Sequence, residues 1–277
     1  MIGTAWAHGP DTSPAVASGV RLEVLIPLLV LAGLYALGCS RLARRPFGAR
    51  RPASMVVGFV ALALALLSPL DELAERFFVT HMVQHMLLIV IAAPALLLAD
   101  PFPVVLWALP RRWRLAGRRF ITRASTAGRV WRATTATAAA WIVFALTLWV
   151  WHVPAAYDAA LSRRWLHDVE HLSFFLAALL FWWPVIHPAP RFRPAAPYPA
   201  RVVYLVLGAF QTAALGLLIA LAPTVLYRAY AGPDALDDQA WGGVVMWGVG
   251  GAVDMLAVLV VVHLTLGSGS RPRMIGS

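Results

Sequence analysis

The chain has 277 residues, of which 60% are hydrophobic and only 13% are charged. A soluble domain of this length cannot bury so much apolar surface, so the composition excludes an ordinary globular protein and predicts an integral membrane protein in contact with the lipid bilayer. The formal net charge of +10 does not indicate nucleic-acid binding, because the basic residues stand in short clusters between long apolar runs.

Seven apolar runs are each long enough to cross a bilayer as a helix. Residues 1–21 precede them and are predicted to form an external tail, since they contain no charged and apolar leader pattern. The sequence thus predicts an all-α fold in which one domain, residues 22–266, is a bundle of seven transmembrane helices, followed by a tail at 267–277. The predicted helices cover residues 22–40, 53–70, 77–99, 134–151, 168–187, 201–222 and 242–266.

The arginines predict the orientation of the bundle. Eighteen of the 23 basic residues follow the first, third, fifth or seventh run, and most acidic residues lie on the other side. Positive charge is concentrated in the cytoplasmic loops of membrane proteins, so the amino terminus is predicted outside and the carboxy terminus in the cytoplasm. The longest connection, residues 100–133, becomes an arginine-rich cytoplasmic loop.

Five of the eight histidines gather at the predicted outer boundary of the membrane. His81 and His85 begin the third run, His152 ends the fourth, and His167 and His171 begin the fifth. The members of each pair are four residues apart, so they stack on one face of a helix. Imidazoles from neighbouring helices in one pocket suit copper or zinc. Ordinary interfacial polar residues are the alternative interpretation of the same pattern.

Sulfur-containing residues narrow the choice of metal. The single cysteine, Cys39, excludes disulfides and cysteine-based metal cages. Met82 and Met86 form a second pair with helical spacing, and Met246 lies in the outer part of the seventh run. Thioether groups beside imidazoles favour Cu(I), although methionine is also a common filler of helix cores. Three further histidines are predicted to be ordinary polar residues, namely His8, His187 and His263.

Four segments resemble the CtaG family of multi-span cytochrome c oxidase assembly factors. They are HMVQHMLLIVIAAPALLLADP, WHVPAAYDAAL, LHDVEHLSFFLAALLFWWPV and LDDQAWGGVVMWGVGG, and the resemblance covers about residues 50–265. It implies a seven-helix protein of the bacterial plasma membrane that serves the maturation of a haem-copper oxidase, whose subunits would be its partners. It also places the five histidines on the histidine pattern of the family, and assigns closure of the site to Asp238, Gln239, Met246 and Trp247.

These observations lead to one leading hypothesis about function. The histidines, with Met82, Met86, Asp238 and Met246, are predicted to bind copper transiently, as Cu(I), and to pass it to the oxidase. A b-type haem protein, a copper transporter and a metal-free assembly scaffold remain open as alternatives. No enzyme is predicted, because the motifs of common hydrolases and phosphate-binding enzymes are missing and the HDVEH run differs from HExxH.

Overall fold

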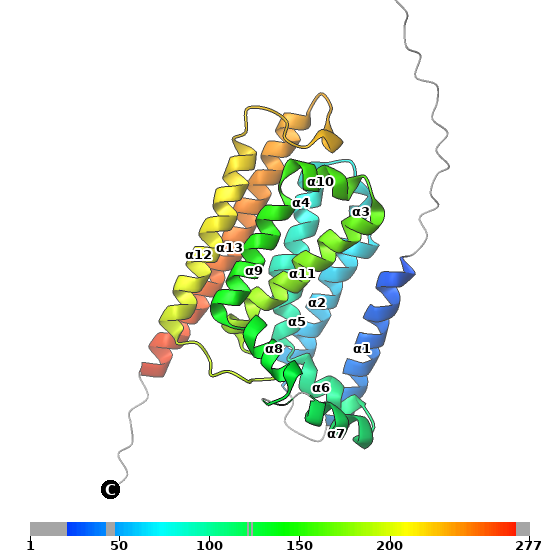
Figure 1. Cartoon of the computed structure of the whole chain (residues 1–277), viewed down its shortest axis with the longest axis vertical. Coiled ribbons are helices and arrows are strands. Elements are labelled where there is room, and N and C mark those ends of the chain that lie inside the picture. The colour runs from blue at the N-terminus through cyan, green and yellow to red at the C-terminus, as the bar shows by residue number, and fades with distance from the viewer. Residues whose placement is uncertain (1–20, 43–47, 121, 123, 270–277) are drawn as a thin grey trace, which may run out of the picture.

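The computed structural model describes residues 21–42, 48–120, 122 and 124–269. The predicted external tail up to residue 20, with His8, lies outside the described residues, as do the side chains of the tail at 267–277. All regular secondary structure in the described part of the chain is helical, which confirms the all-α prediction. Figure 1 shows the long helices side by side in one elongated bundle.

The long helices agree with the predicted runs to within a few residues, except that the last helix begins at Ala235, well before the predicted start at residue 242. They are α1 (Leu22–Leu42), α2 (Arg50–Leu67), α4 (Phe78–Met86) with η1 (Leu87–Ala92) and α5 (Ala93–Leu98), α9 (Thr137–Trp151), α11 (Arg164–Ile186), α12 (Tyr198–Ala220) and α13 (Ala235–Gly269). Short elements connect them, namely α3 (Pro69–Ala74), α6 (Pro101–Ala108), α7 (Arg111–Phe120), α8 (Thr126–Thr134), α10 (Pro154–Leu161) and η2 (Arg228–Tyr230).

Six of these helices are long and apolar enough to cross a membrane by themselves. The predicted fourth span differs, because α9 has only 15 residues and is separated from α8 by a bend of 67°. Thr135 lies at the break, and its hydroxyl donates to the carbonyl of Trp131 at 2.6 Å, a contact that competes with regular helix geometry. By length and composition, the described residues therefore contain six candidate spans, or seven if the bent pair counts as one.

Residues 100–133 are more ordered than the predicted loop. Three short helices occupy most of this segment, because Pro101 starts α6 at the position that proline favours and Ser125 caps α8. The hydroxyl of Ser125 accepts a hydrogen bond from the amide of Gly128 at 3.0 Å. In Figure 1, α7 lies at the opposite end of the bundle from α10. We call the end with α3, α10 and η2 the site end, and the end with α6, α7 and α8 the arginine end.

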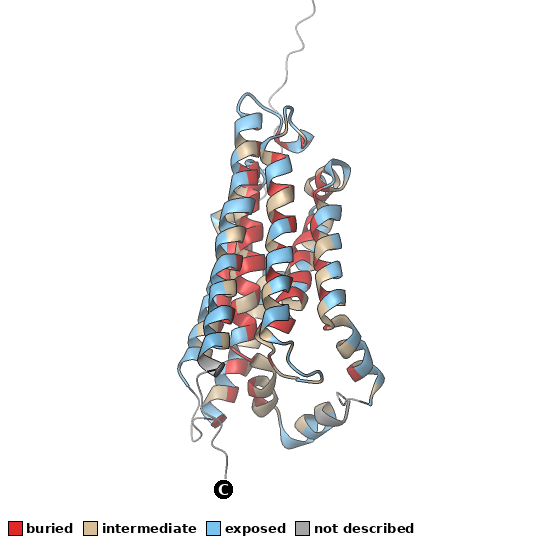
Figure 2. Ribbon diagram, turned by 90° about the vertical axis from the view of Figure 1, so that its left-hand side faces the viewer, coloured by how far each residue is buried: buried red, intermediate tan, exposed pale blue. Residues whose placement is uncertain are grey.

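Burial follows the arrangement expected of helices in lipid. Buried residues turn toward the middle of the bundle, while the outer faces are exposed, as Figure 2 shows. Many of the exposed side chains are large and apolar, including Phe210 at 72% and Leu221 at 77%. Exposed apolar surface on this scale is stable against acyl chains and not against water. The fold is thus that of a membrane protein.

Two local features bring the helices into register. Helices α12 and α13 pack closely through glycines, since a Cβ atom on Gly243 would lie 2.5 Å from the carbonyl oxygen of Gly216. The continuous helix from Phe78 to Leu98 contains a π-helical segment, η1, where one additional residue is accommodated in a turn. The indole of Trp182 donates to the carbonyl of Ile89 within this segment at 3.0 Å, which satisfies a backbone group of the irregular turn.

Candidate metal centre

The five predicted histidines converge at the site end of the bundle. His81 and His85 lie on α4, His167 and His171 lie on α11, and His152 immediately follows α9. Each is at most 7% exposed. We call these residues the histidine cluster. The prediction that imidazoles from separate helices meet in one pocket is confirmed by their positions.

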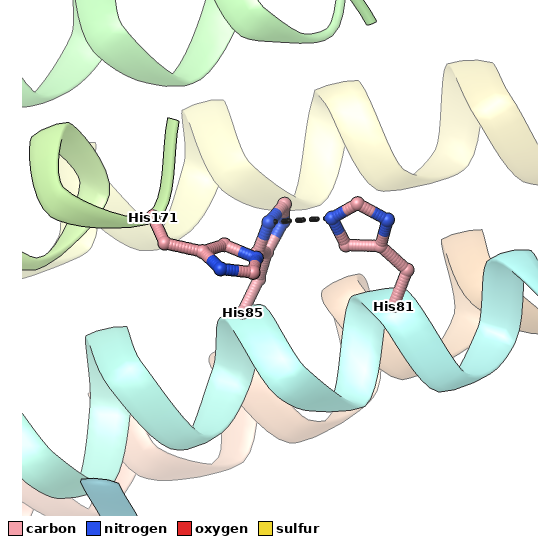
Figure 3. A group of neighbouring side chains, drawn as sticks. All are labelled: His81, His85 and His171. Carbon is pink, nitrogen blue, oxygen red and sulfur yellow. Dashed lines mark hydrogen bonds between the residues drawn. The ribbon is translucent and has the colours of Figure 1, made fainter. Parts of the chain in front are cut away.

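The distances between rings are those of a single compact group. The ring centres of His81 and His85 are 4.3 Å apart, and Nε2 of one lies 2.9 Å from Nε2 of the other. Figure 3 shows the ring of His171 next to that of His85, with 5.2 Å between the ring centres. His167 lies 5.1 Å from His81, whereas His152 lies at the edge of the group, 6.4 Å from His85.

Hydrogen bonds assign the ring protons of two histidines. The hydroxyl of Tyr230 donates its single proton to the carbonyl of Ala74 at 2.7 Å, so Nδ1 of His81, at 2.8 Å, must donate to the same hydroxyl. Burial raises the pKa of Tyr230 well above its ordinary value, so the hydroxyl keeps its proton. Nε2 of His81 is then unprotonated and presents one lone pair to the cluster. In the same way, Nδ1 of His152 donates to the carbonyl of Leu148 at 2.7 Å, which leaves its Nε2 as an acceptor.

Glu170 belongs to the cluster, although it is not one of the ligands predicted from the sequence. It is 1% exposed, and its carboxylate oxygens lie 3.8 Å from Nε2 of His85 and 4.0 Å from Nε2 of His81. The signal was present in the sequence, because residues 167, 170 and 171 lie on one face of a helix.

The cluster contains many polar atoms without hydrogen bonds. Among the residues that the structure describes, seven such buried atoms belong to five members of the group, namely Nδ1 of His85, Nε2 of His152, Nε2 of His167, both oxygens of Glu170 and both nitrogens of His171. Burying so many polar groups is costly unless a partner satisfies them. All of these atoms are types that ligate metal ions, and a cation among them would satisfy several at once.

Ligand atoms within 4.8 Å of one another form two sets that share one residue. The first set is His81, His85 and His171, and the second is His81, His167 and Glu170. Three ligands at this spacing leave room for an ion to draw them together. The residues present therefore fit a metal ion coordinated by imidazole nitrogen with or without one carboxylate.

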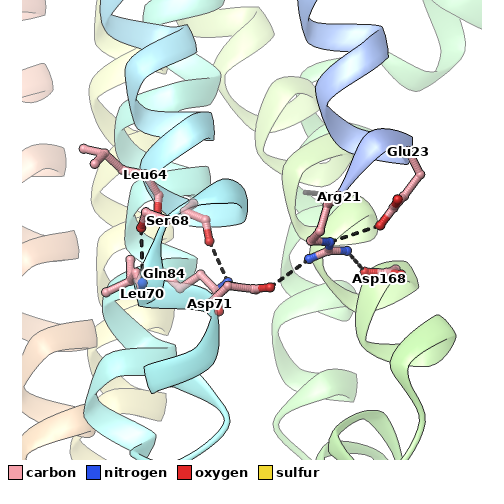
Figure 4. Close-up of polar contacts among 9 residues, drawn as sticks. Arg21, Glu23, Leu64, Ser68, Leu70, Asp71, Gln84 and Asp168 are labelled. Atoms are coloured by element: carbon pink, nitrogen blue, oxygen red, sulfur yellow. Dashed lines mark hydrogen bonds and ion pairs between the residues drawn. The ribbon is translucent and has the colours of Figure 1, made fainter. Parts of the chain in front are cut away.

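Gln84 lies between His81 and His85 in the sequence and anchors α4 to its neighbours. It is fully buried, and its amide nitrogen donates to the carbonyl of Ala65 and to Asp71, both at 2.7 Å. Arg21 in turn pairs with Asp71 and with Asp168, which follows His167 on α11 (Figure 4). This network connects the start of α1 to both helices that carry the histidine pairs, and so holds those helices at a fixed distance.

The structure places the other predicted ligands outside the two sets. The carboxylate of Asp238 accepts hydrogen bonds from the amides of Phe78 and Val79 at 2.6 and 3.1 Å, so it caps the start of α4. Three methionines are buried in the hydrophobic core, namely Met82, Met86 and Met246.

Met86 lies next to α13 in the core. Its sulfur would lie 3.7 Å from a Cβ atom on Gly250, beside a small cavity that Asp254 also lines. This places it on the side of α4 that packs against α13.

The two remaining histidines in the described part of the chain lie apart from the cluster. His187 ends α11 with φ of 55°, and its ring nitrogen lies 3.0 Å from the carbonyl oxygen of Arg193. His263 is exposed on α13. That these residues are ordinary polar residues stays a prediction.

The chain matches one family model over residues 33–266, the cytochrome c oxidase caa3 assembly factor (Caa3_CtaG). The matched region contains the whole histidine cluster, Glu170 and Gln84. No curated protein and no solved structure is significantly similar to the chain.

Proposed function

Because the chain belongs to the family of cytochrome c oxidase caa3 assembly factors, we propose that it binds copper at the histidine cluster and delivers it to a haem-copper oxidase during assembly. The observation that carries this proposal is the set of buried ligand atoms without hydrogen bonds. Copper is the cargo, since the client is a haem-copper oxidase and imidazoles suit copper.

Delivery requires that the ion be released as well as bound. Thiolate cages hold copper tightly, whereas imidazole and carboxylate groups exchange more readily. The cluster contains no cysteine, and the nearest carboxylate is Glu170. We infer that the site is a transient carrier and not a permanent structural centre, and we assign no catalysed reaction to it.

The oxidation state of the ion depends on which residues approach it. The prediction of Cu(I) rests on the preference of thioether ligands for the reduced ion, although Met82, Met86 and Met246 lie in the hydrophobic core outside both ligand sets. The carboxylate of Glu170 is a harder ligand and is equally suited to Cu(II). We retain Cu(I) as the transferred form and assign Glu170 the neutralisation of its positive charge.

The proposal includes an orientation for the bundle. Most arginines cluster at the arginine end and after α11 and α13, so we place that end in the cytoplasm of a bacterial cell. The site end, with the histidine cluster, then faces the outer side of the plasma membrane, and the amino terminus lies on the same side. This arrangement sets the cargo at the depth at which an incoming oxidase subunit would receive it.

A haem group is less compatible with the geometry of the cluster. Two axial imidazoles of a b-type haem must leave room for the macrocycle between them. Nε2 of His81 and Nε2 of His85 are only 2.9 Å apart, and aromatic residues such as Phe174 pack directly against the rings. An absorbance spectrum of the purified protein without a Soret band would agree with this reasoning.

Metal analysis of the purified protein tests the proposal. We expect copper in the wild-type protein, none in the His81→Ala/His85→Ala double variant, and wild-type content in the matched control His263→Ala, whose side chain is exposed on α13. Cells that carry the double variant should lose oxidase activity while whole-cell copper uptake stays unchanged. Equal copper in all three proteins would refute the proposed site, and reduced uptake would favour a transporter.

A further inference from the structure

The histidine cluster adjoins a polar cavity at the site end of the bundle. This cavity has a volume of about 510 Å³ and is lined by Glu75, Asp158, Ser162, Arg164, His167 and Arg228. His167 is the one member of the cluster among these residues, and it also belongs to the second ligand set. It therefore lies between the cavity and the buried part of the cluster.

The two ligand sets lie at different depths. Helix α11 begins at Arg164 at the site end, and His171 lies one turn beyond His167, which corresponds to a shift of about 5.4 Å along the axis. On α4, His85 likewise lies one turn beyond His81. We call the set with His167 and Glu170 the mouth position, and the set with His85 and His171 the deep position.

His81 belongs to both positions but has only one lone pair to offer. Its Nδ1 carries the proton donated to Tyr230, so Nε2 is its single ligand atom. One nitrogen lone pair cannot bind two metal ions at the same time, so an ion at the mouth position excludes an ion at the deep position. The cluster then holds one ion that occupies either of two places.

We propose that the copper ion moves between the mouth and deep positions with His81 as the constant ligand, and that His167 is the group through which it enters and leaves. This inference rests on the proposed function. During the movement, His167 is exchanged for His85 and His171, no redox change is required, and Glu170 stays near both positions, 4.0 Å from Nε2 of His81 and 3.8 Å from Nε2 of His85. Because one ligand stays bound throughout, the ion is never free in the apolar interior, where an uncoordinated charge would be costly.

The movement explains why the deep position can be both well shielded and accessible. His85 and His171 are 1% and 4% exposed, and the mouth residue His167 separates them from the cavity. A deep ion is protected from competing ligands in solution. An ion at the mouth lies beside the cavity, where a ligand from the client can replace His167 or Glu170.

The test uses the purified full chain in detergent, loaded with Cu(I), and a chromogenic Cu(I) chelator that records both equilibrium affinity and release rate. We expect one copper ion per wild-type chain. His167→Gln should slow release about tenfold or more while changing the equilibrium affinity less than about threefold, since the deep position is intact. The matched control His171→Gln should instead lower the equilibrium affinity about tenfold or more and speed release.

The outcomes separate this inference from the proposed function. A wild-type protein that binds no copper overturns both. A protein that binds two ions per chain, or a His167→Gln variant that releases copper at the wild-type rate, overturns the movement and leaves the copper site in place. Should His167→Gln fail to fold, His85→Gln examines the other position, because an ion confined to the mouth should leave faster than from the wild-type protein, and an unchanged rate would contradict the movement.

Discussion

Replacing Glu170 by Gln removes the negative charge of the cluster while keeping the size and shape of the side chain. The carboxylate oxygens are 3.8 and 4.0 Å from the ring nitrogens of His85 and His81, so an ion held by these nitrogens lies within about 4 Å of one negative charge. With an effective dielectric constant of about 20, loss of that charge removes about 4 kcal/mol from the binding of a monovalent ion. Structural relaxation reduces the effect, so we expect the affinity for Cu(I) to fall by about a hundredfold to a thousandfold.

In the metal-free protein, the same substitution should not lower the free energy of unfolding. Both oxygens of Glu170 are buried without a hydrogen bond, so Glu170→Gln removes an unpaired buried carboxylate and should leave the free energy of unfolding unchanged or raise it. At a copper concentration of about one hundred times the wild-type Kd, binding stabilises the wild type by about 2.7 kcal/mol, whereas a hundredfold loss of affinity leaves about 0.4 kcal/mol.

Thermal unfolding with and without Cu(I) measures both effects in one experiment. Glu72→Gln is the matched control, because Glu72 is an exposed acid on α3 at the same end of the bundle. It should keep the stabilisation by copper. The reasoning fails if Glu170→Gln is stabilised by copper as strongly as the wild type, or if the metal-free variant is clearly less stable than the wild type.

Further variants test the packing and the support of the site. Gly243→Ala should lower the free energy of unfolding by about 1–3 kcal/mol through overpacking, whereas Gly248→Ala, with nothing within 4 Å of its Cβ, should be neutral or stabilising in chemical unfolding. Asp238→Ala should cost about 0.5–2 kcal/mol by removing the cap of α4, with Asp237→Ala as a silent control; equal stabilities would refute the capping role. Tyr230→Phe should weaken copper binding about tenfold to a hundredfold in a chelator competition. An unchanged Kd would show that the orientation of His81 does not depend on the hydroxyl of Tyr230.

Much of the site was predictable because it depends on local spacing. The pairs on α4 and α11 are four residues apart, and that spacing alone places their rings on one face of each helix. The arginine distribution likewise indicated which ends of the helices lie together. Contacts between distant segments gave no such signal. Asp238 caps a helix that begins 160 residues earlier in the chain, and only the packed bundle reveals that role.

The bend before α9 was not predictable for a related reason. No proline or glycine marks the break, which lies at the start of the predicted run 134–151, and α8 falls almost wholly in the predicted loop. The break depends on Thr135, whose type is compatible with a continuous helix, and on the packing of α8 at the arginine end. Composition therefore predicted a full span over residues 134–151, where the structure has the 15-residue helix α9, preceded by α8 at an angle of 67°.

The π-helical turn at Leu87–Ala92 makes the number of residues between the histidines of α4 and the helix α5 as important to the site as the identity of the ligands. One residue corresponds to a rotation of about 100° along a regular helix. Deleting a single residue from this turn would restore an ordinary helix and swing the segment with His81 and His85 by that angle relative to Leu96 and Leu97, which pack at the other end. Such a shortened protein would keep every ligand in its sequence and still present its imidazoles to the wrong neighbours, which copper analysis of the deletion variant would reveal.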